Sequence, residues 1–257
     1  MNGVEIDVWT GGDGPTLLYL HGAGGASPFF RAPAPALFLE ELAKSFHVIV
    51  PEHPGYGRCE RPEWLDNIHD LAYFYADFMK ELELGDVHLV GSSLGGWIAL
   101  EMAVRSTARL CSLTLCCAAG IHVKGVPKGD LFLWSPRQMA ENCLMNPEVR
   151  AAYLAYEPTP EIELMRLRNQ QTTALLAWEP RLFDPDLHKW LHRIDVPTHV
   201  VWADDDRLLP VDYAQAFAEL IRDAKVSIIP ESGHLLHLDR PREFSEAVGR
   251  FIREAAA

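Results

Sequence analysis

One stretch of the chain, residues 86–104 with the sequence DVHLVGSSLGGWIALEMAV, constrains the possible folds more than any other. It opens with a short apolar run typical of a buried strand, turns through a Gly-x-Ser-x-Gly pentapeptide, and continues with the spacing and composition of a helix. A serine at the tip of such a sharp turn lies in a strained backbone region, and Gly91 and Gly95 lack a Cβ, so strand and helix can pack closely on both sides. We therefore expect the Ser93 hydroxyl to lie above the sheet edge, close to the N–H groups at the start of the helix.

This strand, turn and helix resemble the nucleophile elbow of the α/β-hydrolase fold. The rest of the chain has a matching pattern. Residues 16–20 form an apolar run typical of a central parallel strand, and further strands are predicted at residues 47–50, 113–117, 198–202 and 226–230. An alternating segment at residues 4–9 indicates a half-exposed strand, and the periodicity of residues 66–84 predicts a helix that ends at Gly85. The predicted fold class is thus α/β, an α/β-hydrolase fold with a mostly parallel central sheet flanked by helices.

The strand–helix rhythm breaks between residues 121 and 187, where helical segments are separated by prolines. Because members of the resembled family commonly insert a helical cap over the site here, we expect residues 1–120 and 188–257 to form the core and residues 121–187 to form a cap, inserted after the sixth strand. Its apolar side chains either line a substrate pocket or only pack the cap onto the core.

The resemblance implies a site built from three side chains in the order Ser, Asp, His. Ser93 corresponds to the nucleophile. Three acids follow the strand at 198–202, and the distances from Trp202 and Pro210 match the family's acid to Asp206, with Ala203 in place of the usual Gly. His234 follows a Gly at the end of the last strand, which is where this fold keeps its catalytic histidine.

Two backbone N–H groups complete the implied site. The His-Gly-x stretch after the strand at 16–20 makes Ala23 one oxyanion-hole donor, and Leu94, directly after the serine, is the other. His53 is interpreted as a loop histidine with no pairing to Ser93.

The reaction implied by these residues is acyl transfer by a serine hydrolase, of the carboxylesterase kind, on a small carboxylic ester or related acyl compound. An Asp at position 93 would instead indicate a haloalkane dehalogenase or epoxide hydrolase. C–C bond hydrolases of ring-cleavage products resemble the chain in length and layout, although they usually carry Trp where Leu235 stands. That class stays open, as do a haloperoxidase-like side reaction and a non-catalytic ligand receptor of the same fold.

Composition limits the partners. The 257 residues carry a net charge of −13, which argues against nucleic acid and anionic membranes. Five cysteines without a C-x-x-C pair predict neither a disulfide framework nor a zinc site, and the mechanism requires no metal or cofactor. No signal peptide or membrane span is visible, so we expect a cytoplasmic protein with a small-molecule substrate. Homo-oligomerisation stays open.

Overall fold

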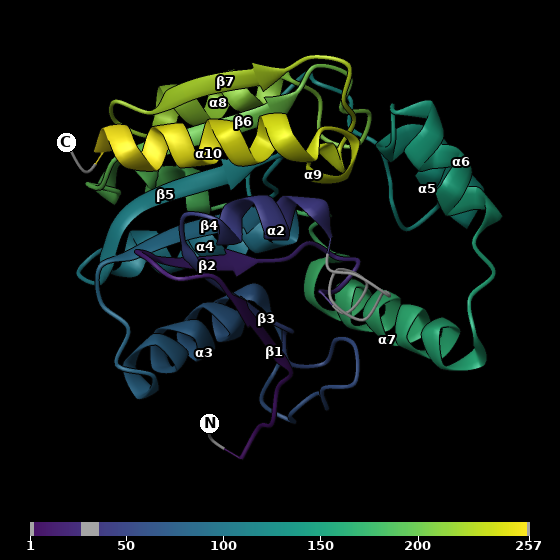
Figure 1. The fold of residues 1–257 in the computed structure, drawn as a ribbon, viewed down its shortest axis with the longest axis horizontal. Helices are drawn as coiled ribbons and strands as arrows, with labels where there is room; N and C mark the ends of the chain where they lie inside the picture. Colours follow the sequence, from purple (N-terminus) through teal and green to yellow (C-terminus); the bar gives the residue numbers. More distant parts are fainter. Residues whose placement is uncertain (1–2, 27–35, 256–257) are drawn as a thin grey trace.

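The computed structural model describes residues 3–26 and 36–255, which build a seven-stranded sheet covered by helices (Figure 1). The strand order is β1-β3-β2-β4-β5-β6-β7, and every neighbouring pair is parallel except the antiparallel pair of β1 and β3. The strands are β1 (Val8–Gly11), β2 (Thr16–Leu20), β3 (His47–Pro51), β4 (Val87–Ser92), β5 (Leu110–Cys116), β6 (Thr198–Ala203) and β7 (Lys225–Ile229). The predicted α/β class with a mostly parallel sheet is confirmed.

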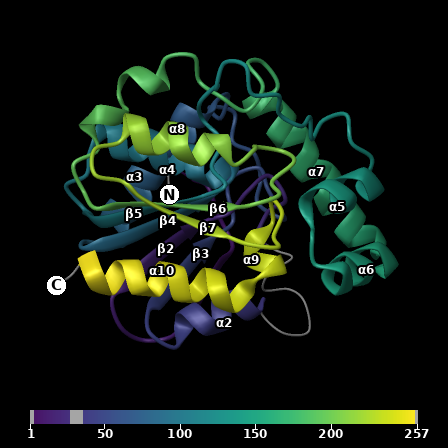
Figure 2. The same ribbon diagram turned by 90° about the horizontal axis from the view of Figure 1, so that it is seen from above.

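Helices cover both faces of this sheet (Figure 2). One face carries α2 (Leu37–Ala43) and α10 (Pro241–Ala255), which pack against each other. The other face carries α3 (Ile68–Glu81), α4 (Leu94–Arg105) and α8 (Asp212–Leu220). Every residue of β4 and of β6 is buried, as expected for central strands that have a helix layer on each side.

Three further helices lie between β5 and β6 in the sequence: α5 (Pro136–Cys143), α6 (Pro147–Ala155) and α7 (Pro160–Ala177). We call them the inserted helices. Each starts with a proline, whose missing N–H costs nothing in the first turn, so the prolines mark helix starts. They lie beyond the carboxyl ends of the parallel strands (Figure 1). The insertion follows β5, the fifth strand and not the predicted sixth, because only β1 to β4 precede it in the described chain.

The chain returns from the inserted helices to β6 through two short 3-10 helices, η1 (Leu187–Lys189) and η2 (Leu191–Arg193). A one-turn helix, α9 (Leu236–Asp239), connects the loop after β7 to α10. Among the helices in the described ranges, none combines the length and the apolar character needed to span a membrane.

Two boundaries differ from the sequence prediction. The strand predicted at residues 4–9 is β1, which starts only at Val8. The helix predicted to stop at Gly85 is α3, which stops earlier because Glu83 takes a left-handed conformation with a φ of 52°. The N–H of Glu83 donates to the carbonyl of Lys80 at 3.1 Å, so a non-glycine residue closes the last turn.

Candidate active site

Ser93 occupies the turn between β4 and α4 in a conformation that few non-glycine residues adopt, with a φ of 54° and a ψ of −114°. Its N–H donates to the carbonyl of Cys116 at 2.9 Å, and its own carbonyl accepts from the N–H of Ala119 at 3.0 Å. The glycines of the pentapeptide leave no room for a side chain, because a Cβ on Gly95 would lie 2.1 Å from the Leu20 carbonyl oxygen. The turn thus holds the serine rigidly, with 7 % of its surface exposed.

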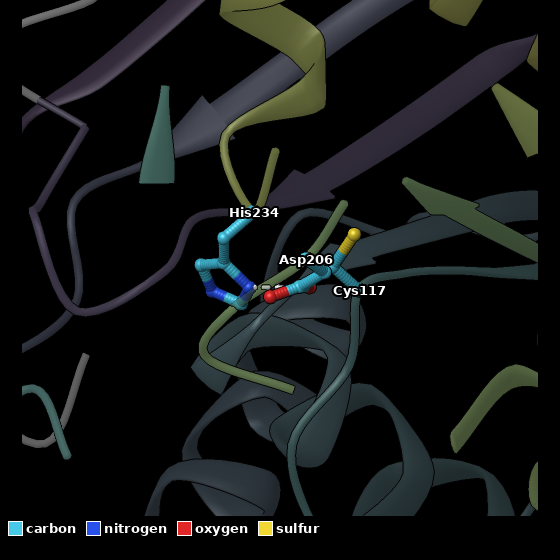
Figure 3. Close-up of side chains that lie close together, drawn as sticks. All are labelled: Cys117, Asp206 and His234. Carbon is cyan, nitrogen blue, oxygen red and sulfur yellow. Dashed lines mark hydrogen bonds and ion pairs between the residues drawn. The ribbon is translucent and has the colours of Figure 1, made fainter. Parts of the chain in front are cut away.

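His234 follows β7 and connects Ser93 to Asp206. Its Nε2 lies 2.9 Å from the Ser93 Oγ, and its Nδ1 lies 2.8 Å from the Asp206 Oδ2. Figure 3 shows the imidazole facing the carboxylate. Because a carboxylate can only accept, the proton sits on Nδ1, and Nε2 is left to accept from the serine hydroxyl. The structure therefore brings the three predicted side chains into one chain of hydrogen bonds.

The carboxylate of Asp206 is fully buried and oriented by the turn after β6. Its Oδ1 accepts from the N–H groups of Leu208 at 2.9 Å and Leu209 at 2.8 Å, which leaves Oδ2 for His234. The two neighbouring acids are exposed and point elsewhere: Asp204 accepts from the N–H groups of the loop that precedes His234, and Asp205 pairs with Arg207.

The loop that follows β2 runs next to the serine. A Cβ on Gly22 would lie 3.2 Å from the Cβ of Ser93, so the predicted donor Ala23 belongs to a segment in close contact with the nucleophile turn. Leu94, the other predicted donor, is the first residue of α4, where backbone N–H groups have no partner inside the helix. Both predicted donors therefore come from backbone segments next to Ser93.

Beneath this loop the rings of His21 and His53 stack with centroids 3.5 Å apart. His53 lies 2.9 Å from the His21 carbonyl through Nε2 and 2.5 Å from the Tyr75 hydroxyl through Nδ1. Burial and the neighbouring His21 lower the pKa of His53 well below its ordinary value, so it stays neutral. His53 is a loop residue, as predicted, and it is fully buried as a support for the segment that contains Ala23.

The inserted helices contact the loop that contains His234. The N–H of Leu235 donates to the carbonyl of Cys143, at the end of α5, at 3.0 Å. The buried carboxylate of Asp239 accepts from Gly233 N–H at 2.8 Å, and also from Met145 N–H at 2.8 Å and Asn146 N–H at 3.0 Å. Asp239 thus joins the segment before α6 to the loop that positions the histidine.

Two groups of side chains have metal-ligating types within 4.8 Å of one another in the described part of the chain. In the first, Cys117 lies beside Asp206 and His234 (Figure 3). Burial, a hydrogen bond with Cys116 and the charge of Asp206 raise the pKa of the Cys117 thiol well above its ordinary value. Both ring nitrogens of His234 are already bonded, to Asp206 and to Ser93.

The second group comprises His69, Glu101 and Asp184. The guanidinium of Arg105 contacts two of them, with nitrogen atoms 2.5 Å from Glu101 Oε2 and 2.8 Å from His69 Nδ1. A positive side chain therefore already pairs with the carboxylate of Glu101, and the group is an ion-pair cluster.

A serine at the β4–α4 turn, an acid after β6 and a histidine after β7 are the arrangement that defines the α/β-hydrolase class. The chain belongs to the alpha/beta hydrolase family, whose model matches residues 17–247, and the resemblance inferred from the elbow is confirmed.

Several known proteins with related sequences are named as hydrolases. RutD of Azorhizobium caulinodans, provisionally named a carbamate hydrolase, is 28% identical over 95% of this chain and 93% of that protein. The 2-hydroxymuconate semialdehyde hydrolase of a Pseudomonas species is 27% identical over 99% of this chain and 93% of that protein. A thermophilic esterase from Thermogutta terrifontis has the same fold, with a TM-score of 0.76 at 23% identity over 99% of this chain and 95% of that chain. Hydrolysis is the reaction class that these relatives support.

Proposed function

We propose that the protein is a serine hydrolase that cleaves a small carboxylic ester or related acyl compound through an acyl-enzyme intermediate. The observation that carries the proposal is the continuous chain of hydrogen bonds from Ser93 through His234 to Asp206, with distances of 2.9 and 2.8 Å. The same proposal includes a small-molecule substrate, no nucleic-acid or membrane partner, and a cytoplasmic setting.

In the first half of the reaction, the Ser93 Oγ attacks the substrate carbonyl carbon while its proton moves to His234 Nε2. The Asp206 carboxylate keeps the imidazole oriented and stabilises the imidazolium that forms. The carbonyl oxygen becomes an oxyanion and accepts hydrogen bonds from the N–H groups of Ala23 and Leu94. The intermediate collapses, the bond to the alcohol oxygen breaks, and the alcohol leaves with the proton from His234.

In the second half, His234 takes a proton from water, and the hydroxide attacks the acyl carbon. The bond between the acyl carbon and the Ser93 Oγ breaks, the proton returns to that oxygen, and the acid is released. Each step uses groups already present in the described site, and the same two N–H groups hold the second oxyanion.

A C–C bond hydrolase is the second candidate, since a relative named as a semialdehyde hydrolase aligns over nearly the whole chain. Leu235 follows the histidine where such enzymes usually have Trp, and for this reason we favour the ester.

The test compares Ser93→Ala with the matched control Ser92→Ala. Ser92 is the preceding residue and is also buried, and its hydroxyl donates to the Cys116 sulfur at 3.8 Å. The control therefore removes a neighbouring hydroxyl group that makes no hydrogen bond to His234. With p-nitrophenyl acetate as substrate, we expect Ser93→Ala to lose about 10⁴-fold or more in kcat and the control to stay active. A phosphonate should label Ser93 covalently. Near-normal turnover by Ser93→Ala would refute the proposal. Turnover confined to a ring-cleavage dienoate would favour the second candidate, and ligand binding without turnover would indicate a receptor.

A further inference from the structure

Helix α7 is unusual because its buried face contains three polar side chains beside three apolar ones. Asn169, Thr172 and Thr173 are at most 5 % exposed, whereas Leu164 and Leu167 on the same helix are 59 % and 55 % exposed. Burying amide and hydroxyl groups costs free energy unless they find hydrogen-bond partners. Two leucines of this helix are exposed while an amide and two hydroxyl groups are buried, so these polar side chains point to a specific role at this contact.

The partners of Asn169 lie in two loops at the carboxyl ends of the sheet strands. Its Nδ2 donates to the carbonyl of Gly24 at 2.8 Å, and its Oδ1 accepts from the N–H of Gly57 at 2.8 Å. The contact is close, because a Cβ on Gly25 would lie 2.5 Å from the Asn169 Nδ2. Both polar atoms of the amide therefore form hydrogen bonds, and its NH₂ group donates to the loop after β2.

The loop that Asn169 holds contains the proposed oxyanion donor. Gly24 and Gly25 directly follow Ala23, and two glycines in sequence leave a backbone with many accessible conformations. A donor stabilises an oxyanion only when it is preorganised at hydrogen-bond distance before the charge develops. Thr173 assists from the next turn of α7, with its Oγ1 3.5 Å from the Ala23 carbonyl.

We propose that Asn169 is a positioning residue of the oxyanion hole: from an inserted helix, it fixes the 23–25 loop so that the Ala23 N–H points at the developing oxyanion. This inference rests on the proposed function. Under this inference, α7 supports the chemical step, in addition to any role in covering the substrate. The effect should be confined to the transition state, because the ground-state carbonyl places little demand on the donor.

The test uses two variants of Asn169 and one matched control. Asn169→Leu removes both hydrogen bonds at similar volume, and Asn169→Asp keeps an acceptor for Gly57 but places a carboxylate oxygen against the Gly24 carbonyl. The control is Thr172→Val. Thr172 lies on the same buried face and donates to the Gly55 carbonyl at 2.7 Å, so its loss also removes a buried hydrogen bond but leaves the 23–25 loop untouched.

Three quantities are measured: kcat and KM for p-nitrophenyl acetate, inhibition by trifluoroacetophenone, and inhibition by acetophenone. The fluorinated ketone adds to the serine and forms an oxyanion, whereas acetophenone imitates only the ground state. Removing a whole oxyanion donor costs about 10²–10³-fold in kcat, so displacing one should cost about 10–100-fold. We expect this loss in kcat and in trifluoroacetophenone affinity for both Asn169 variants, with KM and acetophenone inhibition nearly unchanged.

Several results would overturn the inference. An unchanged kcat in Asn169→Leu, an equal weakening of both ketones, or an equal loss of kcat in Thr172→Val would each reduce Asn169 to a structural contact. These outcomes are read against an active parent that Ser93→Ala inactivates. A parent with no ester turnover, or an active Ser93→Ala, would overturn the proposed function together with this inference, so the two failures are distinguishable.

Discussion

Replacing Asp206 with Asn should remove almost all turnover from a protein that stays folded. The Oδ1 atom accepts from the N–H groups of Leu208 and Leu209, and Oδ2 faces Nδ1 of His234. The single amide oxygen of Asn will stay with the two N–H groups, so its NH₂ group will face Nδ1. Nδ1 must then accept, the ring proton moves to Nε2, and Nε2 can no longer take the proton of Ser93.

The size of the loss follows from this change of tautomer. The corresponding substitution in serine proteases lowers kcat by about 10⁴-fold, which equals about 5.5 kcal/mol of activation free energy. The folded state loses much less, because the two backbone hydrogen bonds remain and only their charged character is lost, at about 1–2 kcal/mol. For a chain of this size that is a decrease of about 2–8 °C in the melting temperature, so the variant is folded at 25 °C.

The two neighbouring acids are the controls. Asp204 uses both oxygens, for the N–H groups of Glu231 at 3.0 Å and Ser232 at 3.1 Å, so Asp204→Asn loses one acceptor and should cost about 1 kcal/mol of stability. Asp205 forms an exposed pair with Arg207, and Asp205→Asn should change almost nothing.

The assay for all three is kcat on one ester, beside thermal melts followed by circular dichroism. If Asp206→Asn keeps more than about a tenth of the parent activity, the tautomer argument fails. If Asp204→Asn or Asp205→Asn is the inactive variant, the acid has been assigned to the wrong residue.

Three further outcomes are expected. Gly95→Ala should lower the free energy of unfolding by more than about 3 kcal/mol, because its Cβ would lie 2.1 Å from the Leu20 carbonyl oxygen, and an unchanged urea midpoint would contradict this. Asp239→Ala leaves three backbone N–H groups without their acceptor and should lower stability by about 3 kcal/mol or more, measured in the same titration. Burial lowers the pKa of His199 to about 4 and the pKa of His237 to about 3. The unfolded chain therefore binds protons below pH 6.5 that the folded protein does not, and stability should fall from pH 6.5 to about 4 by about 1.4 kcal/mol per pH unit for each histidine. His199→Gln should reduce this dependence of stability on pH, and an unchanged slope would show that His199 does not contribute to it.

The residues of the candidate site could be found from sequence because each lies in the turn or loop that follows a strand. Parallel strands end at the same edge of a sheet, so Ser93 after β4, Asp206 after β6 and His234 after β7 had to lie close together once the apolar runs had been recognised. The distance from Trp202 selected Asp206 among three consecutive acids, and that is the carboxylate which reaches His234.

Asn169 and Asp239 could not be found in this way. Both act through backbone groups that are remote in sequence: Asn169 bonds to residues 145 and 112 positions away, and Asp239 to residues 94 and 93 positions away. Hydrophobic periodicity also misleads for α7, because the face that it buries carries an amide and two hydroxyls. The early end of α3 was missed for a local reason, since Glu83 supplies a left-handed conformation that the pattern assigned to Gly85.

Two of the inserted helices, α5 and α6, contribute few buried apolar side chains to the molecule. No residue of α6, all of which the structure describes, is buried, and no residue of α5 belongs to the main apolar core. Segments with few buried apolar contacts open locally at a lower free energy than the whole molecule needs to unfold. Such an opening of α5 and α6 would release the hydrogen bonds to the histidine loop while the sheet stayed intact. We therefore expect a partially unfolded, inactive state, so that turnover is lost at urea concentrations below the main unfolding transition.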